Sequence, residues 1–192
     1  PYWVSYPDMV YLAGGKPIIL ETEMKDNFKI TPKQLEANIS EKTKWFIINS
    51  PGNPTGAVYD KSELKEISKV LLKNPHVNIL SDDIYEHITY GTKFYNVLNV
   101  EPKLYENTFS VNGVSKAFSM TGWRIGYGAG KKELIKAISK IQSQSTTNPC
   151  SISQVAAKHA LQSEKDFLQD WLKKFESRKN LLIDFFESIG EE

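Results

Sequence analysis

Cysteine, histidine and long apolar runs are all scarce in this chain of 192 residues. The single cysteine, Cys150, excludes an intramolecular disulfide and a cysteine-rich metal site, and it favours a reducing, cytoplasmic location. His76, His87 and His159 are far apart in the sequence, and none has a partner at ligand spacing, so we expect no metal site. The apolar runs are only a few residues long, far short of the roughly 20 residues that cross a bilayer, so we expect no membrane partner.

Neither sign of charge is in excess. The chain has 24 Lys and Arg against 23 Asp and Glu, a net charge of +1. This balance argues against nucleic acid as the main partner, because nucleic-acid binding usually demands a basic surplus. A composition of 40% hydrophobic and 24% charged residues is typical of a globular protein, and a chain of this length can bury a sizeable core.

Short apolar runs alternate with helical patterns along the chain. Strands are expected at residues 18–21, 45–49, 77–81, 108–111 and 125–129. Because strands that alternate with helices are typical of parallel sheets, the pattern predicts an α/β fold with a mostly parallel sheet flanked by helices. The small residues of the last strand should let another element pack closely against it.

The expected helices have recognisable starts. Thr31 with Gln34, and Asp60 with Glu63, resemble capping boxes. Further helices are expected over 134–141, over about 151–161 with Ser151 and Gln154 as the cap, and over 167–185, where apolar residues trace a long amphipathic face.

Polar side chains follow three of the predicted strands. They are Asn53, Asp82 with Tyr85, and Ser115 with Lys116, while Arg124 lies a little beyond Lys116. Ligands of open α/β sheets bind outside the carboxyl ends of the strands, so this pattern predicts a polar site for a small anionic ligand. Each residue also has a structural interpretation: Asn53 as a turn residue, Asp82 as a helix cap, Lys116 as a solvated side chain and Arg124 as a partner stacked on Trp123.

Five segments together resemble the class I/II aminotransferases, which are fold-type I enzymes that use pyridoxal 5'-phosphate (PLP). Residues 115–126, SKAFSMTGWRIG, resemble the cofactor-lysine signature of this family. Residues 50–56 resemble its Asn-Pro-Thr-Gly loop, and residues 81–86 its Asp-x-x-Tyr segment. Residues 1–8 and 142–149 are similar to the bacterial aspartate aminotransferase branch, some members of which also use prephenate. Five motifs in the same order make a specific signal.

The resemblance implies a role for each matching residue. Lys116 would form the Schiff base with PLP and, once displaced, would move the proton between the substrate Cα and the cofactor C4'. Asp82 would face the pyridine nitrogen and keep it protonated. Asn53 and Tyr85 would hydrogen-bond the phenolic oxygen of the cofactor, and Asn53 would also reach the substrate carboxylate.

Three further residues complete the implied site. Arg124 would pair with the cofactor phosphate, and Ser115 would assist it. Trp3 would stack on the pyridine face and contact substrate, although a core tryptophan is an alternative interpretation. The position three before Lys116 is a serine in some family members and Gly113 here, so this chain lacks one hydroxyl that those members would offer to the phosphate.

The resemblance also implies an organisation. We expect residues 1–165 to be the central part of the PLP-binding large domain, and residues 166–192 to be a long helix that leads toward the small domain. The N-terminal segment and the rest of the small domain would be absent from this chain. A homodimer is implied, in which Thr147 and Asn148 reach the neighbouring site and Ser143 lies near a position that some members use to hold substrate.

The leading hypothesis is an aminotransferase that moves an amino group between L-aspartate and 2-oxoglutarate. A related PLP enzyme that acts on prephenate or aromatic amino acids, a β-lyase, and a non-catalytic fragment of such an enzyme are alternatives. A nucleotide-binding α/β domain is a weaker hypothesis, because residues 126–130 lack the spacing of a phosphate-binding loop.

Overall fold

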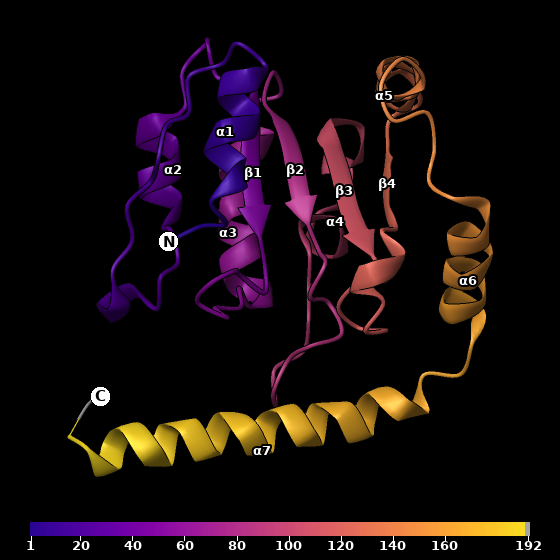
Figure 1. Cartoon of the computed structure of the whole chain (residues 1–192). Coiled ribbons are helices and arrows are strands. Elements are labelled where there is room, and N and C mark those ends of the chain that lie inside the picture. The colour runs from indigo at the N-terminus through magenta and orange to yellow at the C-terminus, as the bar shows by residue number, and fades with distance from the viewer. Residues whose placement is uncertain (191–192) are drawn as a thin grey trace.

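The structure, a computed structural model, describes residues 1–190 and contains one four-stranded mixed sheet. The strands lie side by side in chain order: β1 (Trp45–Asn49), β2 (Asn78–Asp82), β3 (Thr108–Gly113) and β4 (Gly126–Gly130). β1, β2 and β3 are parallel, and β4 is antiparallel to β3 (Figure 1). The predicted α/β class with a mostly parallel sheet is therefore confirmed.

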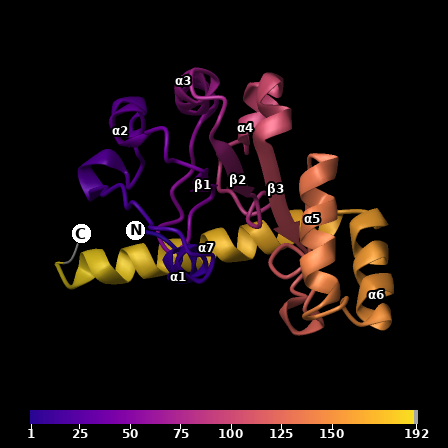
Figure 2. The ribbon, with the colours of Figure 1, turned by 90° about the horizontal axis from the view of Figure 1, so that it is seen from above.

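Helices cover both faces of this sheet. Figure 2 shows α2, α3 and α4 on one side and α1 on the other, while α5 lies at the end of β4 (Figure 1). The helices are α1 (Ser5–Leu12), α2 (Pro32–Asn38), α3 (Lys61–Leu72), α4 (Val97–Val100), α5 (Lys132–Ser143), α6 (Ser151–Gln162) and α7 (Asp166–Ser188). Residues 1–190 also contain three 3-10 turns in the connections between elements: η1 (Met24–Asp26), η2 (Pro102–Asn107) and η3 (Thr121–Trp123).

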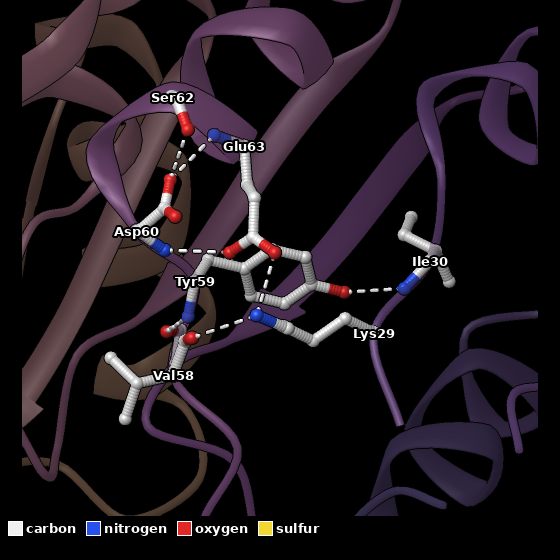
Figure 3. Close-up of polar contacts among 8 residues, drawn as sticks. Lys29, Ile30, Val58, Tyr59, Asp60, Ser62 and Glu63 are labelled. Carbon is white, nitrogen blue, oxygen red and sulfur yellow. Dashed lines mark hydrogen bonds and ion pairs between the residues drawn. The ribbon is translucent and has the colours of Figure 1, made fainter. Parts of the chain in front are cut away.

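Both predicted capping boxes are present. The Asp60 carboxylate accepts from the backbone N–H of Glu63 at 2.8 Å, and the Glu63 carboxylate accepts from the N–H of Asp60 at 2.8 Å (Figure 3). Thr31 and Gln34 form the same reciprocal pair at the start of α2. These contacts satisfy backbone donors that have no partner within the helix, which fixes where α2 and α3 begin.

The main hydrophobic core lies between α3 and the sheet. Leu64, Ile67 and Leu71 of α3 and Ile79 of β2 are all at most 2% exposed. Tyr59 closes one side of this core, where its hydroxyl accepts from the N–H of Ile30 at 2.8 Å (Figure 3). Burial raises the pKa of Tyr59 to about 12, so this phenol is neutral in the folded protein.

The expected strand at residues 18–21 is wrong. This stretch has no strand neighbour among residues 1–190, and Ile18 and Ile19 are exposed. It runs beside the start of α2, where the Gln34 side-chain amide donates to the carbonyl of Glu21 at 3.1 Å. An apolar run favours an extended backbone, but a strand also requires a partner strand, which the run itself does not specify.

The expected cap of α6 is also wrong in detail. Cys150 occupies the N-cap position, Ser151 is the first residue of the helix, and neither provides a side-chain cap. Gln154 donates its side-chain amide to the carbonyl of Pro149 at 2.8 Å. The Ser-x-x-Gln pattern therefore marks the right helix start, one residue away from the predicted cap.

The glycines of β4 allow the close packing that the sequence predicts. The ring of Phe109 lies directly against Gly128, where an added Cβ would overlap it. At Gly130 a Cβ would lie 3.0 Å from another carbon of the same ring and 3.0 Å from the carbonyl oxygen of Thr108. A side chain on either glycine would displace Phe109.

The long C-terminal helix α7 is confirmed. It crosses beneath the carboxyl ends of the strands (Figure 1), and a series of aromatic rings connects its first half to the turn after β3. Neighbouring ring centroids in this series are 5.9 to 6.4 Å apart, in the order Phe118, Phe167, Trp171 and Phe175. The division into domains at residue 166 stays a prediction. The last two residues of the predicted segment 166–192, residues 191 and 192, lie outside the part of the chain that the structure describes. No helix within residues 1–190 has the length and apolar character to cross a membrane.

Candidate active site

The predicted site residues follow the ends of the strands at one edge of the sheet. Asn53, Asp82 and Lys116 come at or just after the carboxyl ends of β1, β2 and β3. Because these strands are parallel, their carboxyl ends lie at one edge. Arg124 precedes β4, and the antiparallel direction of β4 places its start at that same edge.

Asp82 is held through both of its carboxylate oxygens. Its Oδ2 accepts a hydrogen bond of 2.7 Å from the hydroxyl of Tyr6, and its Oδ1 accepts one of 3.2 Å from the backbone N–H of Ile84. The first bond joins α1 to the end of β2 across 76 positions of sequence. The orientation of the Asp82 carboxylate is therefore fixed by two separate elements.

Tyr6 is a buried phenol that only donates to this carboxylate. It is 9% exposed, and burial and the hydrogen bond to Asp82 raise its pKa far above the ordinary value for tyrosine. Its ring also meets the indole of Trp3 edge-on, with the centroids 5.5 Å apart and the planes at 89°. Trp3 itself is 43% exposed among residues 1–190.

Asn49, the last residue of β1, links two of the predicted site residues. Its Oδ1 accepts from the backbone N–H of Asn53 at 2.9 Å, and its Nδ2 donates to the backbone carbonyl of Asp82 at 3.0 Å. Asn49 thus ties the 50–56 loop to the end of β2. Neither Tyr6 nor Asn49 could be recognised as a site residue from the sequence, although Tyr6 lies within residues 1–8, which resemble the family.

Lys116 lies beside Tyr85. Its Nζ is 5.7 Å from the centroid of the Tyr85 ring, and both residues are half-buried. The turn that carries Lys116 closes through a hydrogen bond from the N–H of Ser119 to the carbonyl of Lys116 at 3.1 Å. The cavity between this turn and α7 measures only about 10 Å³, so there is little empty space between Lys116 and α7.

Gly113 is crowded, which explains why this position lacks a side chain. A Cβ there would lie 3.0 Å from the carbonyl oxygen of Ile125 and 3.1 Å from Cδ1 of Ile84. Serine at this position would need one of these neighbours to move.

Arg124 has a left-handed backbone, with φ of 55°. Its guanidinium is exposed, and Nη1 donates to the carbonyl of Thr121 at 3.0 Å, within its own turn. Among residues 1–190 neither Arg124 nor the half-buried Ser115 contacts Asp82, Tyr85 or Lys116 through a side-chain hydrogen bond or ion pair.

The residues expected near a partner subunit are exposed. The Ser143 hydroxyl donates to the carbonyl of Lys140 at 2.8 Å and accepts from the side-chain amide of Gln144 at 3.4 Å. The Asn148 side-chain amide donates to the carbonyl of Pro149 at 2.8 Å. Thr147 has a positive φ of 65°. Their role in a dimer stays a prediction.

A second carboxylate, Asp83, lies buried behind the site. It is 4% exposed and accepts hydrogen bonds from Ser81 at 2.7 Å, Asn96 at 2.9 Å and Ser110 at 2.7 Å. Burial raises the pKa of Asp83, and the three hydrogen bonds oppose that rise. Asp83 thus joins β2, β3 and the start of α4 immediately next to Asp82.

The family model described as aminotransferase class I and II matches residues 1–192, and the chain belongs to this family. The chain is 56% identical over 190 residues to a probable aspartate/prephenate aminotransferase of Rickettsia typhi, a match that covers 98% of this chain and 48% of that protein. It is 54% identical to the aspartate/prephenate aminotransferase of Cereibacter sphaeroides, with 95% and 46% covered.

The fold agrees with solved structures of the same family. The crystal structure of the aspartate aminotransferase from Rhizobium meliloti superposes with a TM-score of 0.96 at 45% identity, covering 98% of this chain and 47% of that one. The fold-type I class is thereby confirmed. The chain spans about half the length of the curated relatives it matches. Members of the family in general depend on PLP.

Proposed function

We propose that the complete protein transfers an amino group between L-aspartate and 2-oxoglutarate, with PLP carried on Lys116. The observation that carries the proposal is the placement of the Lys116 amine beside the Tyr85 ring, at the same sheet edge as the fixed Asp82 carboxylate. The names of the two relatives above favour aspartate as a substrate.

The chemistry of these side chains fits PLP. An amine is needed for the aldehyde, a carboxylate for the pyridine nitrogen, hydrogen-bond donors for the phenolic oxygen and a cation for the phosphate. Lys116, Asp82, Tyr85 with Asn53, and Arg124 supply these groups in that order. Trp3 offers an exposed aromatic ring that can cover the pyridine face.

When bound, PLP supplies an electron sink for the charge that develops at the substrate Cα. Lys116 would hold the cofactor, and its freed Nζ would carry the proton away from Cα. Asp82, held by the Tyr6 hydroxyl and the Ile84 N–H, would keep the pyridine nitrogen protonated. Ser115 would assist Arg124 at the phosphate, and Asn53 and Trp3 would orient the substrate.

Prephenate is the second candidate substrate. Two relatives at 54% and 56% identity carry both aspartate and prephenate in their names, which favours a site that accepts either. Comparing aspartate, prephenate, phenylalanine and cystathionine as substrates would separate this function from that of an aromatic aminotransferase or a β-lyase.

The organisation of the complete protein belongs to the same proposal. We expect a cytoplasmic homodimer, with residues 1–165 in the large domain and residues 166–192 leading into the small domain. Size-exclusion chromatography with light scattering would measure the assembly of the complete protein.

Borohydride reduction with PLP, followed by peptide mass mapping of the complete protein, tests the cofactor site. A phosphopyridoxyl adduct on Lys116 is expected, and Lys116→Ala should remove the adduct. That variant should also slow the half-reaction with aspartate by at least ~10²–10⁴-fold, because it loses the proton-transfer group. Lys33→Ala, an exposed lysine of α2, is the matched control. Undiminished turnover by Lys116→Ala would refute the assignment.

A further inference from the structure

We infer that Tyr6 is a positioning residue that sets the orientation of Asp82 and supports Trp3. This inference rests on the proposed function, because it concerns how two cofactor-facing groups are held. Tyr6 lies between them: its hydroxyl contacts Asp82, and its ring contacts Trp3. No other residue described in the structure makes both of these contacts.

The hydroxyl of Tyr6 makes the stronger of the two bonds that hold Asp82. Its 2.7 Å distance is in the range of short hydrogen bonds from hydroxyl groups to carboxylates, whereas the Ile84 N–H lies at 3.2 Å. The terminal torsion of an aspartate is soft, so a carboxylate held by one weak bond can rotate. Losing the Tyr6 hydroxyl would therefore release the Asp82 carboxylate from the direction that it must keep.

Burial keeps Tyr6 suited to this task. The side chain comes from α1, on the face of the sheet opposite α3 (Figure 2), and reaches the end of β2 while 9% exposed. Burial and the neighbouring Asp82 raise the pKa of Tyr6, and Tyr85 adds to that rise. The phenol therefore stays protonated and donates its hydrogen bond to the Asp82 carboxylate.

The ring of Tyr6 has a separate effect on Trp3. Trp3 is 43% exposed and precedes α1 in the chain. Within residues 1–190 the aromatic contact of Trp3 is the edge-on one with Tyr6, whose ring centroid lies 5.5 Å from that of the indole. Replacing Tyr6 by phenylalanine keeps this ring contact and removes only the hydroxyl, so the variant isolates the effect on Asp82.

The test uses the complete protein with bound PLP and compares Tyr6→Phe with Tyr59→Phe. Both tyrosines are buried, and the hydroxyl of each makes one hydrogen bond, but Tyr59 contacts the backbone of Ile30 in the main core (Figure 3). Both variants are expected to lower the melting temperature of the apoprotein. Only Tyr6→Phe should raise the dissociation constant of PLP, by about tenfold, as expected for losing a hydrogen bond to a charged group.

Two further measurements separate positioning from general stability. The pH titration of the absorption band of bound PLP should shift in Tyr6→Phe and stay unchanged in Tyr59→Phe. In an Asp82→Asn background, Tyr6→Phe should change PLP affinity by less than about twofold, because residues that act through each other have non-additive effects.

The outcomes distinguish the two proposals. If wild-type protein gives no PLP adduct on Lys116, the proposed function and the inference fail together. If wild-type protein binds PLP but Tyr6→Phe binds it equally tightly with an unchanged titration, the inference alone is overturned. An equal loss of affinity in the wild-type and Asp82→Asn backgrounds would also overturn it.

Discussion

The buried carboxylate Asp83 should be one of the most sensitive positions behind the site. Replacing it by alanine removes the acceptor for three donors at once: the hydroxyls of Ser81 and Ser110 and the amide of Asn96. A buried donor without a partner costs about 1–3 kcal/mol. Because the two hydroxyls can rotate toward other acceptors, we take the low end for each and expect a loss of about 3 kcal/mol.

Asp83→Asn is the informative comparison. Its oxygen can still accept from Asn96 and Ser110, while its amide group must donate to a rotated Ser81 hydroxyl, so we expect a loss of about 1 kcal/mol. Asp26→Ala, at an exposed aspartate of η1, should stay within about 0.5 kcal/mol of wild type. Denaturant unfolding of the complete protein, followed by circular dichroism, measures all three. If Asp83→Ala is no less stable than Asp83→Asn, the three hydrogen bonds do not contribute as described.

The same residue gives the protein a pH dependence of known sign. Burial raises the pKa of Asp83 above its value in the unfolded chain, so its contribution to stability is present below about pH 3.9 and is lost as pH rises through the folded pKa. The stability difference between wild type and Asp83→Asn should therefore shrink as pH rises from about 4 toward neutrality. A difference that grows with pH would contradict the raised pKa.

Two other predictions concern the framework of the fold. Asp60→Ala removes the N-cap of α3 and should cost about 1 kcal/mol in denaturant unfolding, whereas Asp60→Ser, which keeps an oxygen acceptor, should lose much less; equal losses would argue against the cap. Gly128→Ala places a methyl group against the ring of Phe109 and should cost about 1–3 kcal/mol, with part of the loss recovered in the double variant with Phe109→Leu. No recovery would show that the ring is not the obstacle.

Features of the fold that depend on neighbouring residues could be predicted from the sequence. Thr31 with Gln34 and Asp60 with Glu63 mark helix starts because each pair satisfies backbone donors within one turn. The strand at 18–21 could not be judged in this way, because a ladder depends on a partner elsewhere in the chain. The antiparallel direction of β4 could not be predicted for the same reason, because an apolar run does not specify the direction in which it pairs with its neighbour.

The site shows the same difference between what the sequence predicts and what only the structure shows. The resemblance identified the residues expected to face the cofactor, and the structure places Lys116 beside Tyr85 and fixes Asp82. The residues that support them were missed because their contacts join distant positions. Tyr6 reaches Asp82 across 76 positions, and Asn49 reaches Asp82 across 33. A tyrosine in a short helix and an asparagine at a strand end have no local pattern that reveals such contacts.

The reversal of direction between β3 and β4 allows Lys116 and Arg124 to lie close together in the sequence and at the same edge of the sheet. β3 is six residues long, so at about 3.3 Å per residue its first and last residues are roughly 17 Å apart. Had β4 been parallel to β3, the residue before it would begin at the far end, and Arg124 would be separated from Lys116 by the height of the sheet. With β4 antiparallel, residues 116–124, which include η3, form a single short connection at the edge where Asp82 ends β2. The amine of Lys116 and the guanidinium of Arg124 therefore lie on one short connection between β3 and β4. An insertion or deletion in this connection would change the separation of the two groups while leaving the hydrogen bonds of the sheet in place.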